Sequence, residues 1–303
     1  MVTVLAGGTG GARLARGMLD VVEPEELTVI ANTGDDVELY GVHVSPDPDL
    51  VAYSLADVID ERGWGIEGDT FEVMDALERA GRPAWFRLGD RDLAMCLIRS
   101  QCLKQGERLT TAHAQVCQAL GLRSAVVPMS DDPVRTRVKL AGRWLPLQEF
   151  MITAGGKHGA TIEGVELIGV GDSRPSPEAV RAIADADTIV IGPSNPVISI
   201  GPILAVPGLQ EAIAKASAPV VAVSPFVHGH AVKGPTEDFC RWAGLPIGTG
   251  CVIEAYAGLL DGVVEDEGAS RARVHVTDTL MSTPEARRRL AQETLEFAAS
   301  LRP

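Results

Sequence analysis

Four aspartates lie close together in the first part of this 303-residue chain: Asp35, Asp36, Asp47 and Asp49. Carboxylate oxygens are the ligands that Mg²⁺ prefers, and a bound Mg²⁺ ion can neutralise the charge of a diphosphate. A carboxylate can also accept the proton of an attacking hydroxyl group. The alternative is structural, because aspartate is also common in turns and at helix starts. We predict a Mg²⁺ site at Asp35 or Asp36, with Asp47 and Asp49 as the less favoured pair of ligands.

A glycine-dense turn precedes these aspartates. Residues 5–11 read Leu-Ala-Gly-Gly-Thr-Gly-Gly after an apolar run at 1–4, and residues 12–19 have helical spacing. Glycines let the backbone approach an anion closely, and a helix N-terminus offers free N–H groups and a positive dipole end. A tight turn at a strand end is the alternative. The predicted phosphate-binding loop consists of Gly8, Thr9, Gly10 and Gly11.

A second polar turn follows a predicted strand at 188–192. Residues 192–196 read Gly-Pro-Ser-Asn-Pro, and a helix opens near Ser199. The two prolines fix the shape of the loop, and the Ser and Asn side chains lie beside the free N–H groups of a helix start. We predict that Ser194 and Asn195 bind an anion or a base, with a structural turn as the alternative.

Charged residues also gather at 87–92, where the sequence reads Arg-Leu-Gly-Asp-Arg-Asp. Arg87 and Arg91 can bind an anionic group. Asp90 can cap the helix that follows it, as Asp69 is expected to cap the helix that starts directly after it. A solvated, charged helix start is the alternative interpretation. We predict that Arg87, Asp90 and Arg91 bind substrate.

The elements that must position these residues alternate along the chain. Apolar strands are expected at 1–4, 27–31, 125–127, 188–192 and 219–223, and helices at 12–19, 177–184, 209–216 and from 284 onward. Strands rich in β-branched residues suit a parallel sheet that is covered on both faces. We predict an α/β fold with a Rossmann-like, doubly wound, mostly parallel sheet. Asn32 to Asp36 then lie at the carboxyl end of the second strand, where ligands of such folds bind.

Two segments interrupt this alternation. Residues 50–122 are mainly helical in pattern, and residues 134–170 contain short alternating strands. We predict a single α/β domain over residues 1–303. In it, 50–122 forms a helical insertion and 134–170 a small β insertion, both on the carboxyl side of the sheet.

The composition disfavours some classes of partner. A formal net charge of −14 disfavours nucleic acids and anionic membranes, because both attract cationic surfaces. No apolar run approaches the roughly 20 residues that span a bilayer, and no segment has the pattern of a signal peptide. The five cysteines show no CxxC spacing, as expected of reduced thiols. We expect a cytoplasmic protein with small-molecule substrates, and neither nucleic acid nor membrane as a partner.

The motifs occur together and in order along essentially the whole chain. After the glycine loop come 32–36 (Asn-Thr-Gly-Asp-Asp), 45–47 (Ser-Pro-Asp), 64–66 (Trp-Gly-Ile), 68–71 (Gly-Asp-Thr-Phe), 88–92 (Leu-Gly-Asp-Arg-Asp), 128–132 (Pro-Met-Ser-Asp-Asp), 148–150 (Gln-Glu-Phe), 192–196 and 277–281 (Thr-Asp-Thr-Leu-Met). The set is far more specific than any one motif. It resembles the 2-phospho-L-lactate transferase family, including its actinobacterial phosphoenolpyruvate transferase branch.

The resemblance implies an activity. Enzymes of this family take a guanylyl-diphosphate-activated three-carbon acid and transfer its phosphoryl-acid unit to the primary hydroxyl of the deazaflavin Fo. GMP leaves, and coenzyme F420-0 or its dehydro form results. The resemblance also implies Mg²⁺ as the cofactor and a homodimer as the assembly.

The resemblance further implies roles for particular residues. The glycine loop would hold donor phosphate, and Ser194 and Asn195 would contact the guanosine diphosphate side. Asp35 and Asp36 would be the catalytic residues, which hold Mg²⁺ or orient the attacking hydroxyl, with Asp47 or Asp49 close by. The metal site predicted in this way consists of Asp35, Asp36 and Asp47. Asp49 and Arg87 occupy positions that the family assigns to the deazaflavin. The predicted substrate-binding residues are Gly8, Thr9, Gly10, Gly11, Asn32, Asp49, Arg87, Asp90, Arg91, Ser194 and Asn195.

One departure and several alternatives stay open. Many members carry an aromatic residue just after the paired acids, whereas residues 37–40 read Val-Glu-Leu-Tyr, so Tyr40 or Trp64 replaces that ring or none does. The donor acid can be phosphoenolpyruvate, 2-phospholactate or 3-phosphoglycerate, and the Ala/Arg-rich segments 87–94 and 98–101 favour the first. A non-catalytic nucleotide-binding regulatory protein on the same fold is an alternative function. A nicotinamide dehydrogenase rests on the glycine turn alone.

Overall fold

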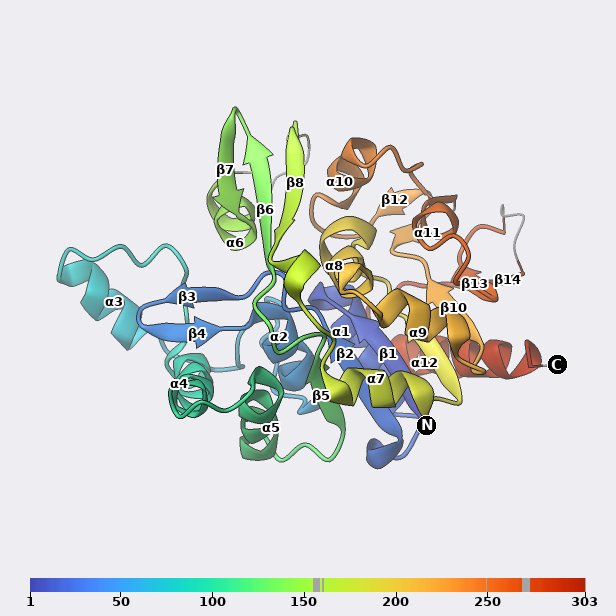
Figure 1. Cartoon of the computed structure of the whole chain (residues 1–303), viewed down its shortest axis with the longest axis horizontal. Helices are drawn as coiled ribbons and strands as arrows, with labels where there is room; N and C mark the ends of the chain where they lie inside the picture. Colours follow the sequence, from blue (N-terminus) through green and yellow to red (C-terminus); the bar gives the residue numbers. More distant parts are fainter. Residues whose placement is uncertain (155–158, 160, 249, 269–272, 303) are drawn as a thin grey trace.

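A parallel β-sheet forms the centre of the computed structural model, which describes residues 1–154, 159, 161–248, 250–268 and 273–302 (Figure 1). The seven strands are ordered β14-β13-β10-β9-β1-β2-β5, and each neighbouring pair is parallel. They are β1 (Val2–Ala6), β2 (Leu27–Ala31), β5 (Ala125–Pro128), β9 (Thr188–Ile191), β10 (Val220–Val223), β13 (Gly262–Glu265) and β14 (Val274–Val276). This sheet confirms the predicted Rossmann-like α/β fold and each of the five expected strands.

The strand order reverses beside β1. From β1 the chain builds one half of the sheet through β2 and β5, and it then returns to build the other half from β9 outward. The loops after β1 and β9 therefore leave the sheet in opposite directions. Such a switch point opens a crevice at the carboxyl edge of the sheet, where ligands of doubly wound folds bind.

Helices cover both faces of the sheet. One apolar core joins a face to α1 (Gly8–Leu19), α2 (Pro46–Leu55), α5 (Leu109–Ala119) and α12 (Pro284–Ser300). A second core joins the other face to α7 (Pro177–Ala184), α8 (Gly201–Ala205), α9 (Leu209–Lys215) and α11 (Gly250–Ala255). Val4 belongs to the first core and Leu5 to the second, because successive strand side chains point to opposite faces. Burial on both faces explains why β1 is apolar except for Thr3, whose hydroxyl donates to the Ala182 carbonyl at 2.7 Å.

The first helix begins earlier than predicted. We expected it from residue 12, but α1 starts at Gly8, so the glycine loop itself forms its first turn. Gly8 has a φ of +66°, which favours glycine. A Cβ atom on Gly10 would lie 2.0 Å from the carbonyl oxygen of Pro193. The glycines therefore allow the loops after β1 and β9 to pack directly against each other.

The two insertions flank the carboxyl edge of the sheet. The segment predicted as helical holds most of α2, followed by α3 (Glu72–Arg79), α4 (Asp90–Lys104) and α5. A hairpin that we did not predict, β3 (Val37–Leu39) with β4 (Val42–Val44), precedes it. The segment 134–170 holds an antiparallel sheet of β7 (Arg143–Pro146), β6 (Arg135–Leu140) and β8 (Gly164–Ile168); residues 155–158 and 160 lie outside the described residues. Figure 1 shows this small sheet standing away from the central one.

The remaining elements are short. They are β11 (Phe226–Val227), β12 (His230–Ala231), α6 (Leu147–Glu149), α10 (Thr236–Trp242) and helical turns at Pro24–Glu26, Phe150–Ala154, Val170–Asp172 and Pro196–Ile200. Among the described residues, no individual helix combines the length and apolar character needed to cross a bilayer. Only Pro196–Ala205 and Leu209–Lys215 taken together meet those criteria, and they are bent by 84° at their break.

Candidate active site

The crevice at the switch point contains a cavity of about 270 Å³, which we call the glycine-loop cavity. The loop after β1 forms one wall, the turn after β9 forms a second, and the segment between β12 and α10 forms a third. The predicted residues that line it are Gly8, Thr9, Gly10, Ser194 and Asn195. Gly11 lies just behind it, where a Cβ atom would come within 2.6 Å of the Ser194 hydroxyl.

Ser194 and Asn195 shape the turn after β9. The backbone N–H of Gly7 donates to the Ser194 hydroxyl at 3.3 Å, which ties this turn to the glycine loop. The Asn195 amide oxygen accepts hydrogen bonds from the N–H groups of Val197 at 2.9 Å and Ile198 at 3.2 Å. Both side chains therefore fix the conformation of the turn, and both line the cavity beside it.

Two cationic side chains line the same cavity. Lys233 Nζ lies 3.4 Å from the Thr9 hydroxyl, and Arg13 projects from the first turns of α1. Burial lowers the pKa of Lys233, and the positive charge of Arg13 lowers it further. An anion bound between them would relieve this repulsion. Sequence reasoning missed both residues, because neither belongs to a motif.

A second cavity of about 520 Å³, the aromatic cavity, adjoins the first. The two cavities share Thr9, Met151 and Lys233 as lining residues. The walls carry four aromatic side chains: Tyr53, Trp64, Trp85 and Phe86. Its polar lining consists of Asp35, Asp47, Asp49, Arg87, Asp92 and Gln148 together with the shared Thr9 and Lys233. Flat apolar walls with polar groups suit a planar heteroaromatic ligand.

Tyr40 does not join that aromatic wall. It lies at the turn of the β3–β4 hairpin, where its hydroxyl donates to the Phe86 carbonyl at 3.0 Å and accepts from the Phe86 N–H at 3.2 Å. Tyr40 therefore holds the loop between α3 and α4 that carries Phe86. Trp64 lines the cavity itself, as one of the two rings that we considered as replacements.

Asp35 is a buried carboxylate at the edge of the aromatic cavity. The Gln148 amide donates to its Oδ2 at 2.7 Å, whereas its Oδ1 is buried without a hydrogen-bond partner among the described residues. Burial raises the pKa of Asp35 well above its ordinary value, and the charges of Asp47 and Asp36 raise it further. An unpartnered carboxylate oxygen in this position can take up a proton or a cation.

Asp47 links the aspartate cluster to the glycine loop. It accepts hydrogen bonds from the Gly8 N–H at 2.6 Å and from the Asn32 amide at 2.8 Å. Burial raises its pKa to about 6 against the effect of these two bonds. Asn32 is fully buried and also accepts from the Gly34 N–H, so it positions Asp47.

Asp36 has different hydrogen-bond partners from its neighbour Asp35. Its carboxylate accepts a hydrogen bond from the Ser45 hydroxyl at 2.7 Å and contacts His43 Nε2 at 2.9 Å. Burial lowers the pKa of His43, but its hydrogen bond with Asp36 and the Asp36 charge outweigh burial and raise that pKa overall. The negative charge of Asp36 also raises the pKa of both Asp35 and Asp47. Its predicted catalytic and metal-binding roles stay predictions.

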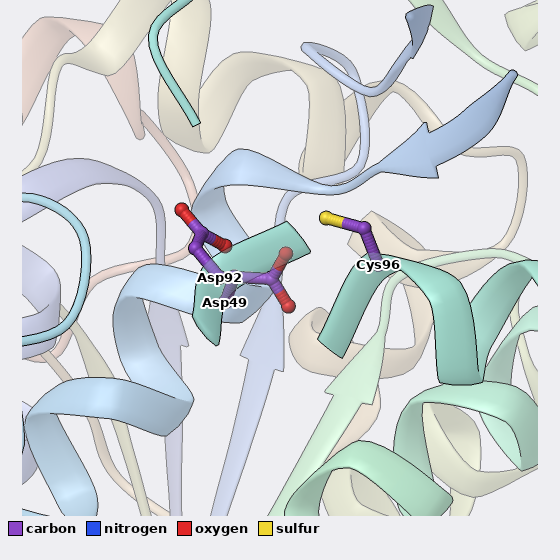
Figure 2. A group of neighbouring side chains, drawn as sticks. All are labelled: Asp49, Asp92 and Cys96. Carbon is purple, nitrogen blue, oxygen red and sulfur yellow. The ribbon is translucent and has the colours of Figure 1, made fainter. Parts of the chain in front are cut away.

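Asp49 lies deeper in the aromatic cavity, in a buried ion pair. Arg99 is fully buried and donates two hydrogen bonds to its carboxylate, at 2.7 and 2.6 Å. Figure 2 shows Asp49 of α2 beside Asp92 and Cys96 of α4, whose ligand atoms all lie within 4.8 Å of one another. Tyr53 donates to Asp92 at 2.8 Å. Because Arg99 already binds both Asp49 oxygens, the cluster is organised around an arginine.

The three residues predicted at 87–92 separate. Arg87 lines the aromatic cavity and pairs with Asp75 at 2.7 Å. Arg91 donates to the Glu67 carbonyl at 3.2 Å. Asp90 accepts from the N–H groups of Glu72 and Val73 at the start of α3, and its hydrogen bond from the Thr70 hydroxyl lowers its pKa.

The capping in this segment is reciprocal, which differs from the sequence-based expectation. Asp69 accepts from the N–H groups of Arg91 and Asp92 at the start of α4, while Asp90 caps α3. Each aspartate thus caps the helix that follows the other one, because the two helix starts lie side by side. A local motif does not reveal this exchange.

Comparison with known proteins gives a consistent picture. The sequence matches the model of the family described as 2-phospho-L-lactate transferase CofD over residues 2–291. It is similar to a phosphoenolpyruvate transferase of Streptomyces griseus, with 38% identity over 99% of both chains. It is also similar to a 2-phospho-L-lactate transferase of Methanosarcina mazei, with 37% identity over 95% of this chain and 97% of the other.

The fold has a solved counterpart. A crystal structure of a member of the UPF0052 family from Bacillus halodurans superposes with a TM-score of 0.57 at 20% identity, and covers 91% of this chain and 87% of that one. This likeness concerns the fold alone.

Proposed function

The chain belongs to the 2-phospho-L-lactate transferase family, and from this premise we propose that it joins a guanylylated three-carbon acid to the deazaflavin Fo. The primary hydroxyl oxygen of Fo forms a bond to the phosphorus that carries the acid. The bond from that phosphorus to the bridging oxygen breaks, and GMP leaves with the electron pair. The hydroxyl proton passes to a base. The product is F420-0 or its dehydro form.

The observation that carries this proposal is the meeting of two different cavities at Thr9 and Lys233. The glycine-loop cavity offers backbone N–H groups, hydroxyls and cations, which suit a nucleotide diphosphate. The aromatic cavity offers ring faces and polar groups, which suit a deazaflavin. Donor and acceptor bound in this way would meet where the cavities meet.

Positive charge at the junction supports group transfer. The leaving GMP gains negative charge as its bond breaks, and Lys233 and Arg13 are placed to stabilise it. Thr9 offers a hydroxyl and the first turn of α1 offers free N–H groups.

We assign the role of base to Asp35. Its unpartnered oxygen lies at the edge of the aromatic cavity, and its raised pKa makes it a better proton acceptor than an ordinary carboxylate. A primary hydroxyl is a poor nucleophile, so a base that takes its proton accelerates attack. Gln148 holds the other Asp35 oxygen in place.

The residues around Asp47 fit a Mg²⁺ ion. The charges of Asp47 and Asp36 raise the pKa of Asp35, so a divalent cation among these carboxylates would remove an existing repulsion. Magnesium is commonly held by one or two carboxylates together with substrate phosphates. When bound, the ion would neutralise charge on the donor diphosphate. Asp47 would hold it, which leaves the unpartnered oxygen of Asp35 to accept the proton.

We propose phosphoenolpyruvate as the acid of the donor. The segments 87–94 and 98–101 look like the actinobacterial branch, and the Streptomyces relative bears the name of a phosphoenolpyruvate transferase. A homodimeric state and a cytoplasmic location stay predictions of the resemblance.

The decisive test combines the protein with Fo and each of three guanylylated acids: phosphoenolpyruvate, 2-phospholactate and 3-phosphoglycerate. Each mixture is made with Mg²⁺ or with a chelator, and the deazaflavin product is followed by mass. We expect one acidic product, GMP release in equal amount, and loss of both without Mg²⁺. Nucleotide binding without any product would instead favour a regulatory protein. Product formation in chelator would overturn the Mg²⁺ assignment.

A further inference from the structure

A third cavity of about 190 Å³ opens beside the glycine loop. We call it the arginine cavity, because Arg13, Arg16 and Arg287 line it. It shares Thr9 with both of the cavities described above, Arg13 with the glycine-loop cavity and Gly63 with the aromatic cavity. Three spaces therefore converge on Thr9.

The reaction needs three spaces at one point. In an in-line displacement at phosphorus, the attacking and leaving oxygens lie on opposite sides, and the remaining oxygens point outward between them. In this donor, one of the remaining oxygens carries the three-carbon acid. The nucleophile and GMP account for two cavities, so the acid needs a third one that faces the same phosphorus.

The charge of the arginine cavity fits a carboxylate. The two acidic partners of Arg287, Asp20 and Asp57, lie 3.5 and 3.7 Å away, beyond ordinary hydrogen-bond length. Arg16 donates a hydrogen bond to Asp20, and its Nε lies 3.6 Å from Asp57, so Arg16 and Arg287 share these two carboxylates. The Nε atoms of both arginines are buried, which leaves their terminal amino groups to face the cavity. Arg13 forms no ion pair among the described residues, and guanidinium groups bind carboxylates through charge-assisted hydrogen bonds.

A helix start adds to this charge. Ser282, Thr283 and Pro284 line the cavity at the N-terminus of α12, a helix of 17 residues whose positive dipole end favours an anion. The opposite wall carries Asp60 and Glu61, and Asp60 is paired with Arg62 at 2.6 Å.

We propose that the arginine cavity binds the carboxylate of the three-carbon acid, with Arg287 as the residue that recognises it. This inference rests on the proposed transferase function and assigns the part of the donor that the other two cavities leave unplaced. The arginine cavity would thus bind the carboxylate of the donor and would not contact its guanosine.

The test compares two donors on three proteins. One donor is the guanylylated three-carbon acid, and the other carries an uncharged amide in place of the carboxylate. The proteins are the wild type, Arg287→Gln and Arg288→Gln; Arg288 is the exposed neighbour on α12 and controls for the loss of charge. Dissociation constants are measured by calorimetry without Fo, so that no turnover is needed.

We expect the wild type and Arg288→Gln to prefer the carboxylate donor by about 10- to 100-fold, the range for a hydrogen bond to a charged group. Arg287→Gln should lose most of this preference while it binds GMP as the wild type does. An Arg287→Lys variant, which keeps the charge, should retain part of the preference and guards against a folding defect in Arg287→Gln. A melting temperature for each variant completes the control.

Two results would overturn the inference. One is an unchanged preference in Arg287→Gln, and the other is an equal loss of GMP and donor affinity. The transferase function is judged separately, by product formation in the wild type. Product formation together with an unchanged preference would thus reject the arginine cavity alone.

Discussion

The glycine-loop cavity and the aromatic cavity are built in different ways. The first consists mainly of backbone and small side chains from loops that leave neighbouring strands of one sheet. The second consists mainly of large side chains brought together from α2, α4, the loops between them and the segment that follows β7. A cavity made of backbone depends on glycines that allow close approach. A cavity made of side chains depends on the packing and charge balance of the elements behind it.

The difference predicts where each cavity is vulnerable. Added volume should damage the glycine-loop cavity, because its walls already touch. Lost partners should damage the aromatic cavity, because it rests on buried ionic groups such as Asp49 and Arg99. The two cavities meet near Asp35 and Asp47, and there we expect activity and stability to depend on the charge of these two carboxylates.

The largest effect is expected at the junction, for Asp35→Asn. The amide keeps the shape of the side chain but cannot accept the hydroxyl proton, and general bases contribute about 10²- to 10⁴-fold to rate. We expect kcat to fall by about 10³-fold, with the affinities for GMP and Fo changed little. Steady-state kinetics and calorimetry measure these quantities. A variant that keeps near-normal kcat would show that another group takes the proton.

The residues of the glycine-loop cavity were predictable because they are local. Gly8, Thr9 and Gly10 are contiguous and follow an obvious strand, and Ser194 and Asn195 follow another strand directly. Strand ends at a sheet edge converge whatever the rest of the chain does. The five strands in strongly apolar runs were found for the same reason. The strands β13 and β14 were missed because they are short and flanked by glycine or charged residues.

The aromatic cavity resisted prediction because tertiary packing assembles it. Trp85 and Gln148 come from different insertions, and nothing in their own segments indicates that they share a cavity. Lys233 likewise lies in a loop without a motif. Adjacency also misleads, since Asp35 and Asp36 are neighbours whose side chains take different partners, Gln148 and His43. Sequence spacing locates such a site but does not orient its members.

The next effect tests the aromatic cavity through Arg99→Met. Removing one partner of a buried ion pair leaves the other charge uncompensated, which costs about 3–5 kcal/mol of stability. We expect a loss near 4 kcal/mol in denaturant unfolding, and weaker binding of Fo. Arg87→Met is the matched control, because Arg87 is more exposed and its pairs with Asp75 and Glu78 are solvated. If Arg87→Met and Arg99→Met lose similar amounts of stability, burial of the ion pair is not what makes Arg99 important.

The glycine-loop cavity is tested by Gly10→Ala. The new methyl group would meet the Pro193 carbonyl at 2.0 Å, so the two loops must separate. Overpacking of this kind costs about 3 kcal/mol at the upper end of its usual range. We expect weaker GMP binding and reduced stability, measured by calorimetry and thermal unfolding. Gly171→Ala is the control, because nothing lies within 4 Å of its added Cβ and its φ is not positive; equal effects would refute the packing argument.

Asp47 connects the cavities and predicts a pH effect. Burial raises its pKa to about 6 in the folded chain, above an unfolded value of about 3.9. The folded state therefore holds this proton more tightly. The stability that protonation of Asp47 provides is complete below about pH 4 and is lost as the pH rises through about 6. The difference amounts to about 3 kcal/mol for a shift of this size.

The measurement compares unfolding of the wild type and Asp47→Asn from pH 4 to pH 8 in a chelator. The wild type should lose more stability across this range than the variant. Added Mg²⁺ should reduce the difference at high pH, because the ion stabilises the ionised carboxylate. Parallel pH curves for the two proteins would show that Asp47 does not titrate in this range.

The smallest effect concerns the edge of the aromatic cavity, at Asp90. We predicted a substrate contact there, whereas the structure uses its carboxylate to accept hydrogen bonds from the start of α3. Asp90→Ala should therefore lower the melting temperature slightly and leave the affinity for Fo nearly unchanged, since the core of α3 still packs through Met74. Asp69→Ala is its natural counterpart, because that side chain caps α4, which carries Asp92 and Arg99 into the buried cluster. It should weaken Fo binding more than Asp90→Ala does. If Asp90→Ala instead abolishes Fo binding while the protein stays folded, Asp90 contacts the substrate directly and the cavity extends to the start of α3.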